Sequence, residues 1–206
     1  MAHSSSTVLP TPTGPIGMQA ADLRALLKQD TAPAHEALEQ LPLMRALADG
    51  RVDDAQYRDY LLLQHRLQSS LEAALRPWAS NEWLGRRLVK TAWLNADLRA
   101  LDRVADTGRV PLPQIVSYPQ ALGVLYVLEG STLGFQVVRK RLPANHLALT
   151  TAGRFLLGYG PETGSHWRSF LDEIAALPCA DWPVAVAAAL GTFATFQQVF
   201  SKARHG

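Results

Sequence analysis

Cysteine is nearly absent from this chain, in which Cys179 is the only one among 206 residues. A single cysteine excludes a disulfide within the chain and a zinc site built from several thiolates. It is typical of a reducing compartment, so we expect a cytoplasmic protein. Cys179 follows Pro178 in an expected loop with no histidine close in sequence, and we assign it no role.

Charged residues are also scarce, at 18% of the chain, whereas hydrophobic residues make up 48%. Soluble domains usually carry about 25% charged residues. The composition therefore favours a folded domain with a large core over a disordered tail. The net charge of +2 lacks the strong basic bias that nucleic-acid-binding proteins usually show, so we expect no nucleic-acid partner.

Long hydrophobic runs are lacking too. The longest, PVAVAAALGTFATF at 183–196, falls short of the roughly 20 residues that span a bilayer, so we expect no membrane association. The N-terminal stretch is rich in Ser, Thr, Pro and Gly and does not have the pattern of a secretory signal. We expect a disordered leader over residues 1–19 and one domain over residues 20–206.

From residue 20 onward the apolar residues recur at helical rather than alternating spacing. Pro33 is expected to kink or restart the first helix, with Asp30 or Thr31 capping the second piece. We find no internal repeat and no convincing hairpin. The fold class is therefore all-α, a single-domain helical bundle of about six to eight helices. The expected helices cover about 20–41, 54–75 (capped by Asp53), 81–106, 120–141, 151–158, 162–177 and 181–202.

The expected helix from residue 120 contains Gly130 and Gly134, which are four residues apart and so share one helix face. Each costs up to about 1 kcal/mol relative to alanine in a helix interior. The spacing is compatible with close helix–helix packing, and equally with a flat ligand lying against bare backbone. Ser131 and Thr132 add hydroxyl groups that can orient a ligand or a water molecule.

His35 is the second candidate among six histidines, because it stands beside the apolar stripe of the first helix. A lone helical histidine is more often a surface residue, but a neutral imidazole facing an apolar pocket also suits heme iron. Lys28 lies two turns earlier on the same face, within reach of an anionic group on such a ligand.

The other basic residues are weaker indicators of a functional site. Arg168 can make a forked contact to a carboxylate or can belong to a solvated helix face. The basic run at 139–141 suits a helix C-terminus, and it can also face an acidic protein partner. Arg86, Arg87 and Lys90 are interpreted as a solvated face. The chain has no Walker loop, nucleophile elbow, H-E-x-x-H or dinucleotide fingerprint, so kinase, serine hydrolase and Rossmann functions lack support.

Together these pieces resemble the heme oxygenase family, in particular its bacterial branch found beside bacteriophytochromes. LKQDTAPAHE at 27–36 is similar to the family's proximal helix, and LYVLEGSTLG at 125–134 is similar to its distal helix, the most specific match. WRS at 167–169 matches a propionate-binding segment, and the phenylalanines of the last helix fall where the family lines its pocket. The resemblance covers about residues 22–203.

The resemblance implies that heme, both cofactor and substrate, is held between these two helices. His35 would be the axial ligand of the iron, and Gly130, Ser131 and Gly134 would form the catalytic distal face. The other heme-binding residues would be Lys28, Tyr126, Phe135, Arg168, Phe193 and Phe196. The ring would be cleaved with O2 to biliverdin, carbon monoxide and ferrous iron. Electrons would come from an external donor of the ferredoxin or flavin-reductase type, and a bacteriophytochrome is a possible acceptor of biliverdin.

Three departures from the family pattern bear on this expectation. Ser131 stands where the eukaryotic branch has an aspartate, Phe135 where many relatives have another glycine, and Pro33 lies two residues before His35. Phe135 would narrow the pocket, and it favours an alternative, a non-catalytic heme- or bilin-binding protein on the same fold. A further alternative is a thiaminase-type helical hydrolase with a cysteine nucleophile, against which the loop position of Cys179 argues.

Overall fold

The structure, a computed structural model, describes residues 19–105 and 108–202, with side chains from residue 23 on. The expected leader falls almost wholly outside the described residues. Those residues form ten α-helices and three short 3-10 helices and contain no strand, which confirms the all-α expectation. Three of the α-helices are only four residues long: α4 (Glu82–Gly85), α7 (Leu147–Thr150) and α8 (Arg154–Leu157).

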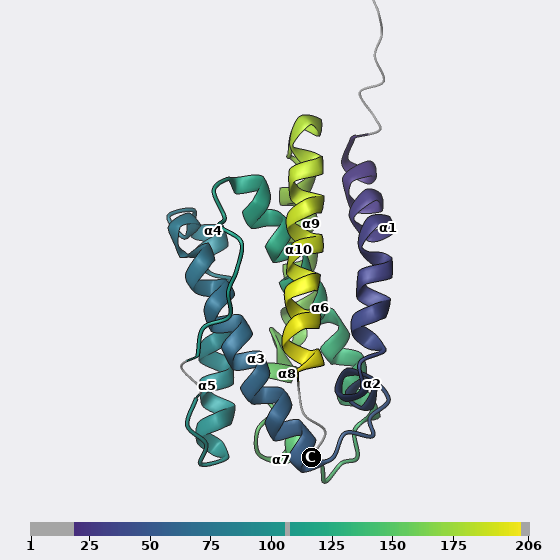
Figure 1. Cartoon of the computed structure of the whole chain (residues 1–206), viewed down its shortest axis with the longest axis vertical. Coiled ribbons are helices and arrows are strands. Elements are labelled where there is room, and N and C mark those ends of the chain that lie inside the picture. The colour runs from purple at the N-terminus through teal and green to yellow at the C-terminus, as the bar shows by residue number, and fades with distance from the viewer. Residues whose placement is uncertain (1–18, 106–107, 203–206) are drawn as a thin grey trace, which may run out of the picture.

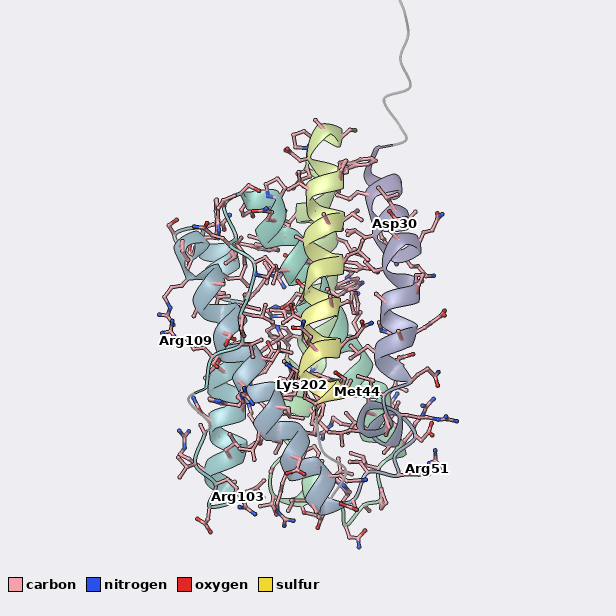
Figure 2. All side chains as sticks on the ribbon, in the orientation of Figure 1. Asp30, Met44, Arg51, Arg103, Arg109 and Lys202 are labelled. Carbon is pink, nitrogen blue, oxygen red and sulfur yellow. The ribbon has the colours of Figure 1, made fainter. Side chains whose placement is uncertain are left out.

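Two long apolar helices, α6 (Tyr118–Arg141) and α10 (Trp182–Ser201), pack against each other in the middle of the molecule. Figure 1 shows α10 at the front with α1 (Gln19–Glu39) beside it, and α9 (Thr163–Ala175) contacts both α1 and α6. Gly123 allows the close α6–α10 approach, because a Cβ there would lie 2.1 Å from the Ala185 carbonyl oxygen. Side chains fill the space between these ribbons in Figure 2.

The same two helices bear on the expectation that no segment of the chain is long and apolar enough to span a membrane. Residues 118–141 and 179–201 are long and apolar enough, by length and composition, to cross a bilayer. The longest uninterrupted apolar run did not reveal this, because polar residues divide both segments. Core helices pass the same test, and here each of the two buries one side against its neighbours.

Helix α1 is continuous through Pro33, so the expected restart at Asp30 or Thr31 is wrong. A proline in a helix leaves the carbonyl four residues earlier without its backbone donor. That residue is Gln29, which is exposed, so water can replace the lost bond. The Thr31 hydroxyl donates to the Leu27 carbonyl at 2.7 Å and stays within the helix instead of capping a new one.

The expected helix over 81–106 is instead two helices, α4 and α5 (Lys90–Ala100). The buried carboxylate of Glu72, on α3 (Asp54–Leu75), accepts the backbone N–H groups of Lys90 and Thr91 at 2.6 and 3.2 Å. This contact starts a new helix at Lys90, because it satisfies donors that would otherwise be orphaned. The chain leaves the helix at Asp102, which has a φ of 53°, and not at Gly108 as expected.

Other boundaries agree with their sequence signals. Asp53 caps α3 and Ser117 caps α6, and each forms a capping box with a glutamine three residues later. A short helix that the sequence did not indicate, α2 (Pro42–Ala48), follows α1. The Arg141 side chain donates to the Ala48 carbonyl at 2.7 Å and so ties the end of α6 to the end of α2. By contrast, Arg51, Arg103 and Arg109 point outward in Figure 2.

Candidate functional site

Helices α1 and α6 form the two walls of the candidate site. The Tyr126 phenol on α6 lies close to the Thr31 side chain on α1, whose hydroxyl acts to lower the pKa of the phenol. Both helices run towards α2, which follows α1 in the chain and binds the end of α6. Residues four apart share a helix face, so His35 and Gly130 lie one turn beyond the Thr31–Tyr126 contact, on facing sides. We call this region the α1–α6 site.

The imidazole of His35 is open to a ligand. Its side chain is 54% exposed and packs edge-on against Phe193 of α10, with ring centroids 5.7 Å apart. Nδ1 lies 3.7 Å from a Glu39 carboxylate oxygen, one turn further along α1. Within the part of the chain that is described, Nε2 has no hydrogen-bond partner. An imidazole whose Nδ1 faces a carboxylate and whose Nε2 is free is the usual arrangement of a metal-ligating histidine.

The glycines of α6 leave bare backbone on the same side. Among the described residues, a Cβ added at Gly134 would meet nothing within 4 Å, and one at Gly130 would meet only the Trp167 ring, at 3.9 Å. Helix–helix packing therefore does not require glycine at either position, in contrast to Gly123. The ligand interpretation of this glycine pair is the one that the geometry favours.

The neighbouring hydroxyls are directed into the helix itself. Ser131 and Thr132 both donate to the Leu128 carbonyl, at 2.8 and 3.0 Å. Thr132 is 1% exposed and lies against Gly158, so it cannot orient a ligand as expected. Ser131 is partly exposed and remains the only one of the two that borders the site.

Phe135 does not lie where the sequence indicated. Its side chain is buried, and its ring packs against Phe155 of α8 with centroids 4.9 Å apart. One residue turns an α-helix by about 100°, so Phe135 faces the core although Gly134 faces open space. The expectation that Phe135 narrows the ligand site is wrong, and the argument for a non-catalytic protein that rested on it falls away. Phe196 is buried as well, at 3% exposure, on α10 with Phe193.

Three polar groups lie around the α1–α6 site. Lys28 on α1 and Arg168 on α9 are exposed and form no ion pair among the described residues. Tyr126 lies between α1 and α9, 6.0 Å from the Trp167 ring, and burial raises the pKa of its phenol. Two free cations and a neutral phenol suit an anionic ligand with a flat apolar body.

Comparison with known proteins shows the family of the chain. The Heme oxygenase family model matches residues 21–202. The chain belongs to the heme oxygenase family. A curated heme oxygenase from Xanthomonas campestris is 33% identical over 132 residues, which are 62% of this chain and 77% of the relative.

Solved structures have the same fold. The heme oxygenase of Neisseria meningitidis, in its NO- and CO-bound forms, has a TM-score of 0.67 at 23% identity and covers 89% of this chain and 94% of its own. Heme oxygenase from Leptospira interrogans gives 0.66 at 18%, covering 87% and 98%. Heme oxygenase-1 of the cyanobacterium Synechocystis, in complex with heme, gives 0.68 at 16%, covering 88% and 91%. The family's members degrade heme, so the thiaminase-type alternative is set aside, and Cys179 is simply exposed.

The most polar part of this heme oxygenase core was missed from the sequence. Arg87 and Lys90, expected on a solvated face, are 4% and 1% exposed, and both pair with the buried carboxylate of Glu129 at 2.8 and 2.7 Å. The Tyr159 hydroxyl donates to the same carboxylate at 3.0 Å. Burial alone would raise the pKa of Glu129, but Lys90 and Arg87 lower it below its ordinary value. Glu129 is the one charged residue between 118 and 138, and such an isolated charge on an apolar helix requires a partner.

Other candidate sites in the described residues are weaker. No three His, Cys, Asp or Glu side chains within residues 23–105 and 108–202 gather as metal ligands, so an iron site would rest on one histidine. A cavity of about 440 Å³ lies on the side of α10 opposite Phe193, lined by Val124, Val184, Gly191 and Thr195 among others. It is separate from the α1–α6 site. The 139–141 basic run is largely engaged, since Arg139 donates to the Gly153 carbonyl and Arg141 to Ala48.

Proposed function

We propose that the protein binds heme in the α1–α6 site, where His35 would hold the iron, and cleaves the ring to biliverdin, carbon monoxide and ferrous iron. The observation that carries this proposal is the free Nε2 of His35 on one helix opposite bare backbone at Gly134 on the other. The residues fit heme, because one wall supplies an open nitrogen ligand and the other wall supplies space without side chains.

His35 can serve as an iron ligand only when it is neutral at Nε2. The Glu39 carboxylate near Nδ1 favours the tautomer with the proton on Nδ1, which leaves the Nε2 lone pair free. The edge-on contact with Phe193 limits rotation of the imidazole ring. Together these two neighbours aim Nε2 away from the surface of α1.

Lys28, Arg168 and the Tyr126 phenol would hold the two carboxylates of heme. The first two are free cations on different helices, so a carboxylate can reach each without displacing an existing ion pair. Phe193, whose ring packs edge-on against His35, would supply apolar surface for the ring. Because these anchors lie on α1, α6 and α9, their positions set the rotation of the ring in the site.

When bound, heme supplies both the iron that activates O2 and the carbon skeleton that is cleaved. On the α6 wall, Gly130 and Gly134 place no side chain towards the site, which would leave room for a small gas molecule. The partly exposed Ser131 adds a hydroxyl to this wall, which can reach a water molecule by rotating away from Leu128.

Three features of cellular context complete the proposal. The electrons would come from a separate donor of the ferredoxin or flavin-reductase type, because the sequence has no flavin or nicotinamide motif. The resemblance to the bacteriophytochrome-associated branch supports a bacteriophytochrome as acceptor of biliverdin. The scarcity of cysteine supports a cytoplasmic setting.

The activity is tested by single-turnover conversion of bound heme. Purified protein with one equivalent of ferric heme should lose its Soret band and gain biliverdin absorbance on addition of ferredoxin, its reductase and O2. His35→Ala should lose this conversion, whereas Glu36→Ala, which changes an exposed neighbour on the same helix, should retain it. Full conversion by His35→Ala would show that the assigned ligand is wrong.

A further inference from the structure

The guanidinium group of Arg87 bridges the two helices that border the α1–α6 site on the distal side. Nη1 donates to Glu129 of α6 at 2.8 Å, and Nη2 donates to the backbone carbonyl of His166 on α9 at 3.1 Å. The side chain is 4% exposed, so neither hydrogen bond competes with bulk water. A guanidinium makes the two contacts through two nitrogens of one planar fork, whereas an ammonium group would have to make both from a single nitrogen.

The two acceptors immediately precede the two residues that face each other across this border. Glu129 is followed by Gly130, and His166 is followed by Trp167. Of the residues that the structure describes, Trp167 alone comes near the position that a Gly130 Cβ would take, with its ring at 3.9 Å. Arg168, a proposed anchor of the ligand, comes next on α9. The position of one guanidinium therefore fixes a distal glycine and a carboxylate anchor relative to each other.

We propose that Arg87 is a positioning residue that sets the spacing between Gly130 and Trp167. Through this spacing it restricts heme to one orientation in the site, which we call its seating. The seating part of this inference rests on the proposed function, whereas the spacing part does not. Arg87 itself lies behind the two helices and touches neither His35 nor the open side of Gly134.

The surroundings of Arg87 make the bridge rigid. Its guanidinium lies over the Trp83 ring at 4.1 Å, and the Trp83 indole N–H donates to Ser169 of α9 at 2.9 Å. The segment 83–87 is thus hydrogen-bonded to α9 at two points about one turn apart. On the other side, Glu129 is held through its second oxygen by Lys90 and Tyr159.

Lys90 provides a matched control within the same cluster. It pairs with the same Glu129 carboxylate at 2.7 Å and is equally buried, but the described contacts include none from Lys90 to α9. Lys90→Met therefore removes a buried ion pair while leaving the α6–α9 bridge. Arg87→Lys keeps the buried positive charge but removes the planar fork whose two nitrogens reach the two acceptors.

The variants are best made in a Gly191→Ala background, which offsets part of their lost stability. Gly191 lies inside α10 with nothing within 4 Å of an added Cβ, and it lies on the face opposite Phe193. Alanine is the better helix former at such a position. Thermal unfolding of each variant then shows how much stability has been lost independently of seating.

The spacing is measured first without heme, by fluorine NMR of protein labelled with fluorotryptophan, with the Trp167 signal assigned through Trp167→Phe. We expect the Trp167 resonance to shift or broaden in Arg87→Lys and to keep its position in Lys90→Met. An unchanged Trp167 resonance in Arg87→Lys, or an equal change in Lys90→Met, would overturn the proposal whether or not heme binds.

The seating is measured by proton NMR of the heme methyl groups in the ferric cyanide complex, in which each seating gives its own set of resonances. The ratio of minor to major seating should rise in Arg87→Lys on the order of fivefold, the effect of losing one net hydrogen bond. It should not rise in Lys90→Met. If heme binds through His35 and the ratio is the same in all variants, the inference fails while the proposed function stands. If the unsubstituted protein shows no His35-ligated heme, the proposed function fails separately.

Discussion

Glu129→Gln is the substitution whose effect on stability follows most directly from the structure. It replaces the carboxylate that is ion-paired with both Arg87 and Lys90, two cations that are 4% and 1% exposed. Breaking a buried ion pair by removing one partner costs about 3–5 kcal/mol, because a charge is left buried without compensation. For a domain of this size each kcal/mol lowers Tm by about 2–4 °C, so we expect a loss of about 6–20 °C.

The assay is thermal unfolding followed by far-UV circular dichroism at neutral pH. The matched control is Glu82→Gln, which removes a carboxylate paired with Arg86 at 3.3 Å on the surface, where both side chains are mostly exposed. That variant should melt as the unsubstituted protein does. A loss of less than about 1 kcal/mol in Glu129→Gln would refute the reasoning, since it would show that water reaches the two cations.

The pH dependence has a definite sign. Burial acts to raise the pKa of Glu129, but Lys90 and Arg87 outweigh it, so the pKa lies below its ordinary value of 4.5. A carboxyl whose pKa is lowered by folding stabilises the protein above its ordinary pKa and loses that contribution as the pH falls through the folded value. The difference in stability between the unsubstituted protein and Glu129→Gln should therefore shrink below about pH 4.5.

Three further substitutions test the packing. Gly191→Ala should raise the stability by about 0.5–1 kcal/mol in chemical denaturation, because α10 has space for the methyl group. Gly123→Ala should lower Tm, because the added Cβ would lie 2.1 Å from the Ala185 carbonyl; an unchanged Tm would contradict the close α6–α10 approach. Phe135→Ala should cost about 3–5 kcal/mol yet leave heme affinity within about twofold in a spectrophotometric titration, since its ring packs on Phe155. A large loss of heme affinity would show that the Phe135 side chain contacts heme.

The sequence was sufficient where a local signal dominates. Helix α3 begins after Asp53, as expected, because the capping box satisfies the first backbone donors. His35 and the glycine pair could be selected as candidates because helical spacing alone decides which helix face they share. The structure then adds that Gly134 borders open space, which spacing alone could not distinguish from a packing contact.

The sequence was insufficient where a long-range contact decides. Glu72 starts α5 at Lys90 from 18 residues away, and no local pattern in 81–106 shows this break. Arg87 and Lys90 belong to residue types that usually lie on the surface. They are buried here because both side chains pair with Glu129, about 40 residues later in the chain. The direction of Phe135 likewise depends on Phe155 of a four-residue helix that only tertiary packing holds in place.

The central claim is that His35 ligates heme iron in the α1–α6 site, and resonance Raman spectroscopy of the ferrous heme complex tests it most directly. The unsubstituted protein should show one iron–histidine stretching band. His35→Ala should lose that band, and Glu39→Gln should keep it at a shifted frequency, because the carboxylate near Nδ1 affects the basicity of the ring. An unaltered iron–histidine band in His35→Ala would contradict the account.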